Sequence, residues 1–139
     1  MFEVKRGILR AETFNVLAES VGWGHPPIEQ VKIAIENSIY TVCVEDDKEI
    51  IAMGRMIGDN SMSYFIKDVA VMPSYQGKGV GKLVITDMLS FIKDKTPKSW
   101  KVCVELISAS EKEGFYEKFE FQRRPSATSG SGMSLMVEK

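Results

Sequence analysis

The stretch that decides the fold runs from residue 68 to residue 82 and reads DVAVMPSYQGKGVGK. It begins with a short run of β-branched and apolar residues, which predicts a β-strand that ends at Pro73. Three glycines follow between residues 77 and 81, and apolar residues then recur at helical spacing as far as residue 93. The stretch therefore predicts a strand, a glycine loop and a helix in direct succession.

The glycine loop is a candidate binding site for a phosphate or pyrophosphate group. Glycines let a ligand approach the backbone closely, and the first amides of a helix have no partner within the helix. The helix dipole adds partial positive charge there, and Lys78 and Lys82 add whole charges. On these residues alone, a flexible turn beside two lysines is an equally good interpretation.

The spacing of the loop argues against the two best-known nucleotide motifs. A P-loop needs Gly-x-x-x-x-Gly-Lys-Ser/Thr, but Gln76 stands at the first glycine position and Leu83 at the hydroxyl position. A dinucleotide fingerprint needs Gly-x-Gly-x-x-Gly, whereas the glycines here are spaced Gly-x-Gly-x-Gly. ATP or GTP hydrolysis and NAD binding are therefore not expected.

The rest of the chain alternates between strand and helix patterns, which predicts an α+β fold. We expect a single domain over residues 1–139, with a mixed, mostly antiparallel central sheet flanked by helices and one β-helix-β crossover around the glycine loop. The patterns predict strands at 2–5, 40–44, 50–57, 64–72, 100–107, 119–121 and 133–137, and helices at 11–20, 28–35, 78–93 and 111–118.

Composition excludes several classes of function. The net charge of -1 offers no basic surface for nucleic acid or an anionic membrane. No apolar run approaches the roughly 20 residues that span a bilayer, and no export signal is visible, so we expect a cytoplasmic protein. Cys43 and Cys103 are expected to be buried free thiols, and the single histidine, His25, leaves no zinc pattern, so no metal is expected.

Two motifs resemble those of a known family. Gln76, Gly79 and Gly81 match the Gln/Arg-x-x-Gly-x-Gly/Ala signature of the GCN5-related N-acetyltransferases. Residues 114–121, GFYEKFEF, are similar to the family's Phe-Tyr-x-Lys-x-Gly-Phe segment, although Glu120 replaces its glycine. Upstream of this segment, Ala109 and Lys112 stand where the family commonly has asparagine and alanine. The resemblance extends over nearly the whole chain.

The resemblance implies an acetyl-coenzyme A-dependent N-acetyltransferase with no metal. Acetyl would pass to a primary amine, on a small molecule or a peptide, by direct attack in a ternary complex. Backbone amides of the loop would hold the pyrophosphate, and the preceding strand edge would pair with the pantetheine arm. The expected coenzyme-binding residues are Val69, Ala70, Val71, Gln76, Gly77, Lys78, Gly79, Val80, Gly81, Lys82 and Phe115. A homodimer is the default expectation for the assembly.

Two residues are expected to move protons. The resemblance implies that Tyr116 protonates the departing thiolate, although it also fits a packing role beside Phe115. An amine must lose a proton before it attacks, and Asp68 is our choice of base because its strand adjoins the predicted thioester site. Capping of a loop by Asp68 is nearly as good an interpretation, and Glu45, Asp46 and Glu105 are other candidates.

Two residues are assigned to the acceptor side. Trp23 lies between the first two predicted helices, in a region that often forms a wall of the acceptor pocket in this family, or else it covers the edge of the core. Arg55 faces an acidic acceptor or, as we favour, pairs with Asp59. His25 is expected to be an exposed loop residue.

Two other interpretations stay open. One is a non-catalytic module of the same fold that binds acyl-coenzyme A, which the departures at Ala109 and Glu120 favour and Tyr116 opposes. The other is a domain whose anion site has nothing to do with coenzyme A. A ping-pong route through Cys103 is disfavoured because no motif suited to an acyl-enzyme surrounds either cysteine.

Overall fold

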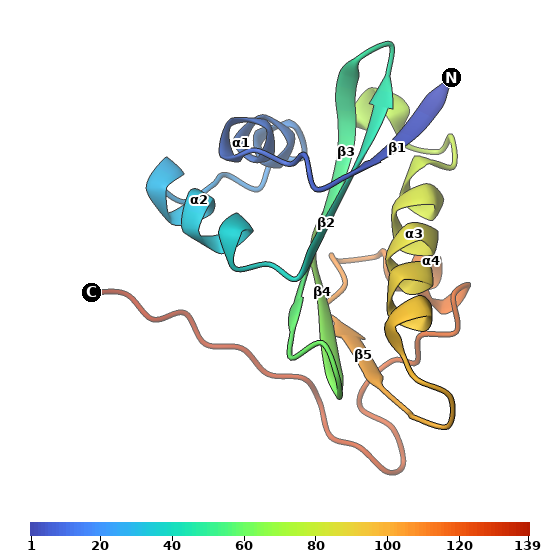
Figure 1. Ribbon diagram of the computed structural model, residues 1–139. Helices are drawn as coiled ribbons and strands as arrows, with labels where there is room; N and C mark the ends of the chain where they lie inside the picture. Colours follow the sequence, from blue (N-terminus) through green and yellow to red (C-terminus); the bar gives the residue numbers. More distant parts are fainter. The chain divides into compact units, whose positions relative to one another are not determined.

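Five strands in the order β1-β2-β3-β4-β5 form the central sheet of the computed structural model, which describes residues 1–139 (Figure 1). The chain divides into two compact units, residues 1–105 and residues 106–139. The strands are β1 (Phe2–Arg6), β2 (Tyr40–Asp46), β3 (Glu49–Gly58), β4 (Ser63–Val71) and β5 (Cys103–Leu106). The helices are α1 (Ala11–Ser20), α2 (Ile28–Glu36), α3 (Val80–Lys95) and α4 (Glu113–Glu117).

β2, β3 and β4 form an antiparallel meander, as turns at polar residues between apolar runs predict, and β1 pairs antiparallel with β2 although α1 and α2 separate them in the chain. β5 differs, because it follows the long helix α3. The amide of Cys103, at the start of β5, donates to the carbonyl of Met62, just before β4 (N···O 2.9 Å). The two strands begin at the same end of the sheet, so β4, α3 and β5 form the predicted crossover in a mixed sheet.

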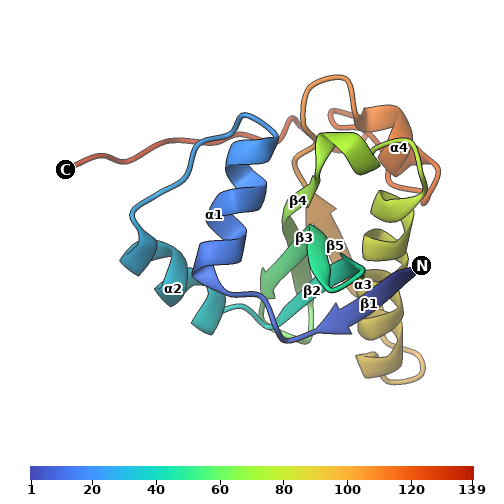
Figure 2. The same ribbon diagram turned by 90° about the horizontal axis from the view of Figure 1, so that it is seen from above.

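The two faces of the sheet are covered by different helices. α1 and α2 lie against one face and α3 against the other (Figures 1 and 2). On the first face, Cys43 and Met53 are fully buried against apolar residues of α1, among them Phe14 and Leu17. Burial of this apolar surface is the main source of the fold's stability. α1 and α3 bury most of their predicted apolar stripes, whereas α2 buries only Val31 and leaves Ile28 exposed.

Gly54 lets α3 approach β3 closely. A Cβ added at Gly54 would lie 2.7 Å from a methyl carbon of Val84 and 2.8 Å from the methyl of Met88. The Met88 side chain is flexible, but a valine in a helix has essentially one rotamer and cannot move aside. This position therefore sets the distance between helix and strand.

Replacing Gly54 by Ala is expected to destabilise the protein by about 1–3 kcal/mol, because the added methyl overpacks the contact. A thermal melt measures the effect. Val84→Ala removes the clashing methyl, so Gly54→Ala should cost less in that background than in the wild-type protein. Equal losses of stability in both backgrounds would show that the contact with Val84 is not the cause.

The second unit is small and contains α4. Phe115, Tyr116, Phe119 and Phe121 pack edge to face, with ring centroids 5.0–6.1 Å apart. Arg123 donates from its guanidinium to Glu117 (2.8 Å) on the surface of this unit. The aromatic spacing in the sequence thus produces a local cluster around a single helical turn.

Two strand predictions are wrong and a third is too long. The amides of Phe119 and Glu120 donate back to the carbonyls of Tyr116 and Glu117, which continues the helical turn and leaves residues 119–121 unable to pair in a sheet. Residues 133–137 pair with no strand, and their apolar side chains are 84–92% exposed. The strand predicted at 100–107 shortens to β5, and Cys103 is exposed there instead of buried, since β5 is an edge strand.

No helix of the chain combines the length and the apolar character that crossing a bilayer requires.

Candidate active site

β4 carries a bulge close to its carboxyl end. Met53 is opposite Ala70 and Arg55 is opposite Lys67, so the single residue Gly54 of β3 faces two residues of β4. One of these two is Asp68, whose φ of +54° is left-handed and rare for a residue with a side chain. A bulge bends its strand and frees backbone groups from the ladder. The sheet is therefore irregular immediately before the glycine loop.

The edge of β4 that faces β5 is only partly covered. β5 has four residues and begins beside the start of β4, which has nine. Parallel strands advance by nearly the same distance per residue, so β5 ends before β4 does. The last residues of β4, Val69, Ala70 and Val71, are consequently left without a neighbouring strand on that side. Apart from the Val71 carbonyl, which accepts from Gln76, their backbone groups on that side pair with no strand.

The glycine loop leads directly from this edge into α3. After the short 3-10 turn Pro73–Tyr75, Gly77 and Gly79 adopt φ of +77° and +81°, values that glycine reaches without strain. Gly79 is the N-cap of α3, and no side chain caps the helix. The first bond of the helix runs from the Leu83 amide to the Gly79 carbonyl (3.2 Å). The amides before Leu83 therefore point outward without a partner in the helix.

The surroundings of the loop suit an anion. A Cβ added at Gly77 or Gly79 would meet nothing within 4 Å, so the loop is open to a ligand. The Gln76 side-chain amide donates to the Val71 carbonyl (3.0 Å) and fixes the loop to the end of β4. Lys78 lies over the Tyr75 ring, with 5.4 Å from Nζ to the centroid. Unpaired amides, a helix dipole and a lysine fit a pyrophosphate.

Tyr75 anchors the other side of the loop. Its hydroxyl donates to Asp46 (2.9 Å), and this hydrogen bond is the main reason why the pKa of Asp46 lies below its ordinary value. The N-terminal amine also reaches Asp46 (3.4 Å). These contacts give Asp46 a structural role, so it is a weaker candidate base than Asp68.

Arg55 and Asp68 form an ion pair on the face of the sheet that α1 and α2 cover. The Arg55 Nε donates to Asp68 Oδ2 (2.9 Å), and the two side chains are only 12% and 22% exposed. The prediction that Arg55 pairs with Asp59 is wrong. Asp59 accepts the amides of Ser61, Met62 and Ser63 in its own turn, and these hydrogen bonds lower its pKa. The bulge changes which residue of β4 lies opposite Arg55, so the pairing with Asp68 could not be predicted from the sequence.

Asp68 keeps one carboxylate oxygen free. Its Oδ2 accepts from Arg55, whereas Oδ1 has no hydrogen-bond partner in the chain and is not among the buried unpaired atoms. A donor arriving from outside the chain can therefore bind Oδ1. On the other side of the pair, an Arg55 guanidinium nitrogen donates to the Ser38 hydroxyl (3.3 Å), which links the pair to the end of α2.

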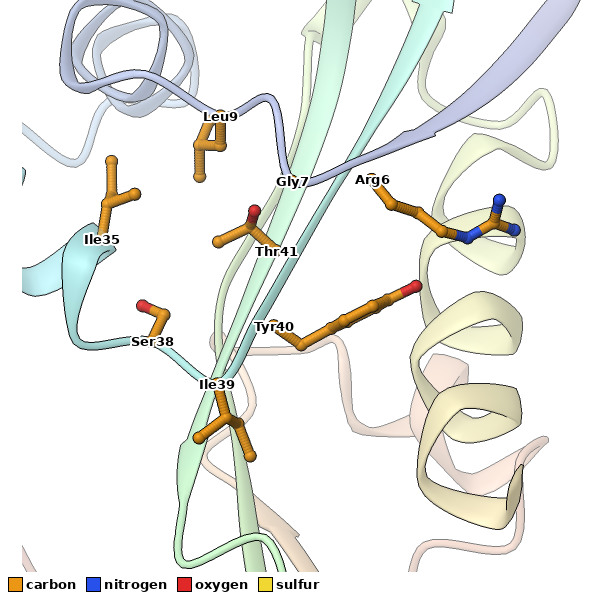
Figure 3. A pocket seen from close by; sticks show the side chains of 8 residues that line it. All are labelled: Arg6, Gly7, Leu9, Ile35, Ser38, Ile39, Tyr40 and Thr41. Atoms are coloured by element: carbon orange, nitrogen blue, oxygen red, sulfur yellow. The ribbon is translucent and has the colours of Figure 1, made fainter. Parts of the chain in front are cut away.

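A pocket of about 420 Å³ is lined in part by Ser38, the residue that binds Arg55 of this ion pair (Figure 3). Leu9, Ile35 and Ile39 supply apolar walls, and Ser38 and Thr41 supply hydroxyls. The remaining lining residues are Gly7, Arg6 and Tyr40; the last two extend toward α3, where both bind Asp87. Nothing in the sequence pattern indicated this pocket, since its residues come from two separate segments, 6–9 and 35–41.

The loop between α1 and α2 carries the other predicted acceptor residue. Trp23 is 46% exposed, and only its backbone amide is fixed, by the Ala18 carbonyl (3.0 Å). His25 is an exposed loop residue, as predicted, and its Nε2 lies 2.7 Å from Glu19. A hydrogen bond with the Pro26 carbonyl and this contact with Glu19 raise the pKa of His25. Trp23 is thus available to a ligand.

Tyr116 and Phe115 belong to the second unit, in α4. Burial raises the pKa of Tyr116 above its ordinary value, so its hydroxyl is a proton donor throughout the neutral range. The ring packs between Phe115 and Phe121. The packing role and the chemical role that the sequence left open are therefore compatible in one residue.

The two cysteines differ in environment. Burial raises the pKa of Cys43 to about 12, so this thiol is protonated and unreactive at neutral pH. Cys103 is exposed on β5. No three His, Cys, Asp or Glu side chains gather in a way that would hold a metal ion.

Comparison with known proteins gives the family. A family model described as an acetyltransferase (GNAT) domain matches residues 36–123. The chain is 29% identical over 118 residues to an uncharacterized N-acetyltransferase, ycf52, of Pyropia yezoensis, covering 82% of this chain and 66% of that one. A protein of the same description from Gracilaria tenuistipitata var. liui is 30% identical, with 82% and 63% covered. The chain spans about half to two thirds of the length of such curated relatives.

Solved structures agree with the family model. A probable acetyltransferase from meticillin-resistant Staphylococcus aureus superposes with a TM-score of 0.86 at 31% identity, covering 99% of this chain and 100% of that one. A GNAT family protein from Streptococcus pneumoniae gives 0.83 at 27% identity, with both chains fully covered. The chain belongs to the GNAT acetyltransferase family. The predicted α+β fold class and the resemblance read from the two motifs are both confirmed.

Proposed function

We propose that this protein transfers an acetyl group from acetyl-coenzyme A to a primary amine by direct attack in a ternary complex. The observation that carries the proposal is the open glycine loop at the start of α3, directly after a bulged strand with an uncovered edge. Family membership supports it. The loop and the strand edge together offer what a long anionic coenzyme needs: donors for the pyrophosphate and a strand for the pantetheine amides.

The coenzyme-binding roles fall on two short segments and on Phe115. The amides from Gly77 to Lys82 would hold the pyrophosphate, with Lys78 and Lys82 adding charge, while the amide of Gln76 donates to the Pro73 carbonyl (3.2 Å). The backbone of Val69, Ala70 and Val71 would pair with the pantetheine arm and polarise the thioester carbonyl. Phe115 would pack against the coenzyme. Backbone donors suit this task because they are fixed by the fold before the ligand arrives.

We assign the two proton transfers to Asp68 and Tyr116. Asp68 Oδ1 would accept a proton from the amine, directly or through water, so that nitrogen can attack the thioester carbon. The carbon–sulfur bond then breaks and the thiolate takes the Tyr116 proton. The raised pKa of Tyr116 keeps this proton in place at neutral pH. Trp23 and Arg55 would lie on the acceptor side.

A transfer assay tests the proposal. Release of free thiol from acetyl-coenzyme A is measured with and without a panel of primary amines. Amine-dependent release with formation of the acetamide is expected. Binding of acetyl-coenzyme A without amine-dependent release would instead favour the non-catalytic acyl-coenzyme A module.

The route of transfer has its own test. Because attack is direct, Cys103→Ala should keep turnover within about twofold of the wild-type protein, and initial-rate plots should intersect instead of running parallel. Loss of turnover in this variant, with coenzyme binding intact, would indicate an acyl-cysteine intermediate. The buried Cys43, with a pKa of about 12, serves no such route.

A further inference from the structure

The pocket of about 420 Å³ that Ser38 lines has a selective composition. Its walls are apolar at Leu9, Ile35 and Ile39, and its polar groups on the α2 side are the hydroxyls of Ser38 and Thr41 (Figure 3). No carboxylate lines it. The one cation of the lining, Arg6, is paired with Asp87 of α3. The pocket thus suits an apolar group with a neutral polar substituent and offers nothing to a second ammonium group.

Thr41 of the pocket and Asp68 belong to strands on either side of β3. Thr41 on β2 is directly opposite Arg55 on β3, and both face α1 and α2, as the buried pair Cys43 and Met53 does. Arg55 in turn binds Asp68 on β4 and Ser38 at the pocket wall. Thr41 is therefore two strand spacings, about 10 Å, from β4. An acceptor whose amine lies at the free Oδ1 of Asp68 would extend along this row of residues toward the pocket.

We infer that the pocket receives the non-reacting body of the acceptor and that the acceptor class is a primary monoamine with an extended apolar body. The inference rests on the proposed function, because it takes the reacting amine to lie at Asp68. Polyamines and aminoglycosides are disfavoured acceptors, since the pocket has apolar walls and offers no carboxylate to their further ammonium groups.

An alkylamine series tests the inference. With acetyl-coenzyme A saturating, kcat/KM is measured for straight-chain primary amines of increasing length, for spermidine and for an aminoglycoside. Each added methylene that enters the pocket should raise kcat/KM about fourfold until the pocket is full. Spermidine and the aminoglycoside should fall well below an alkylamine of equal length. A flat series, or spermidine as the best acceptor, would overturn the inference.

Two variants of α2 make the test specific to the pocket. Ile35→Trp fills the pocket, whereas Ile33→Trp is its matched control, because Ile33 is on the same helix and 61% exposed. Ile35→Trp should abolish the gain with chain length and leave the KM for acetyl-coenzyme A within twofold. Ile33→Trp should behave as the wild-type protein. Equal series in all three proteins would place the acceptor elsewhere.

A binding measurement on the wild-type protein tests this inference separately from the proposed function. It does not depend on the folding of any variant. Octylamine and spermidine are each titrated into the wild-type protein while methyl NMR signals of Leu9, Ile35, Ile39 and Thr41 are followed. Octylamine should shift these signals and spermidine should not. Unmoved signals with octylamine overturn the pocket assignment even if acetyl transfer is found. Shifted signals without any acetyl transfer leave the pocket assigned and contradict the proposed function.

Discussion

Replacing Tyr116 by Phe is expected to lower kcat about 100-fold, the usual contribution of a positioned general acid. The KM values should change little, because the ring that packs against Phe115 and Phe121 is kept. Steady-state kinetics at saturating acetyl-coenzyme A measure the effect. Tyr64→Phe is the matched control, since Tyr64 is a buried tyrosine whose hydroxyl binds only Asn60 (3.1 Å). Equal rates for Tyr116→Phe and the control would contradict the assignment.

The pH profile supplies a second readout for Tyr116. Its hydroxyl donates a proton only below its pKa, and burial raises that pKa above the ordinary value of 10. Rising pH therefore removes the donor only above pH 10, where kcat of the wild-type protein should fall. The Phe variant has no such group, so its much lower kcat should lack this alkaline decrease. An alkaline decrease of the same size in both proteins would assign it to another group.

Replacing Asp68 by Ala is expected to lower kcat/KM for the acceptor about 100-fold through loss of the base. It should also destabilise the protein by about 1–3 kcal/mol, because the Arg55 guanidinium, in a side chain only 12% exposed, loses its carboxylate partner. The two effects have different causes, so a second variant is needed to separate them. A thermal melt and acceptor kinetics are measured on the same preparations.

The double variant Asp68→Ala with Arg55→Met provides that separation. Removing both charges leaves no unpaired ion in the half-buried site, so most of the lost stability should return. The lost activity should not return. Recovery of activity along with stability would show that Asp68 only positions neighbouring groups, as a residue that caps a loop would.

The sequence predicted most of the first unit because local patterns and tertiary packing agree there. α1 begins and ends at the residues that its apolar spacing indicates, and α3 follows the glycine loop as expected. Alternating apolar residues and polar turns were enough to predict the three antiparallel strands β2, β3 and β4. The glycine loop was recognisable because its chemistry belongs to the backbone, which a few glycines reveal directly.

Features that depend on distant residues could not be predicted. The bulge at Asp68 depends on the register between β3 and β4. Because of this register, Arg55 binds Asp68 instead of Asp59. Residues 119–121 have strand-forming side chains, but their amides are used by the turn after α4. The pocket combines Leu9, Ser38 and Thr41 from segments that only the fold brings together.

The thermal midpoint with and without acetyl-coenzyme A tests the central claim most directly, with free phosphate and ADP compared at equal concentrations. A ligand at 100 times its dissociation constant adds about 2.7 kcal/mol of stability, which corresponds to roughly 10 °C in a chain of this size. The glycine loop and the uncovered edge of β4 predict such a shift with acetyl-coenzyme A and a much smaller one with phosphate. No shift with acetyl-coenzyme A, or an equal shift with phosphate, would contradict the account.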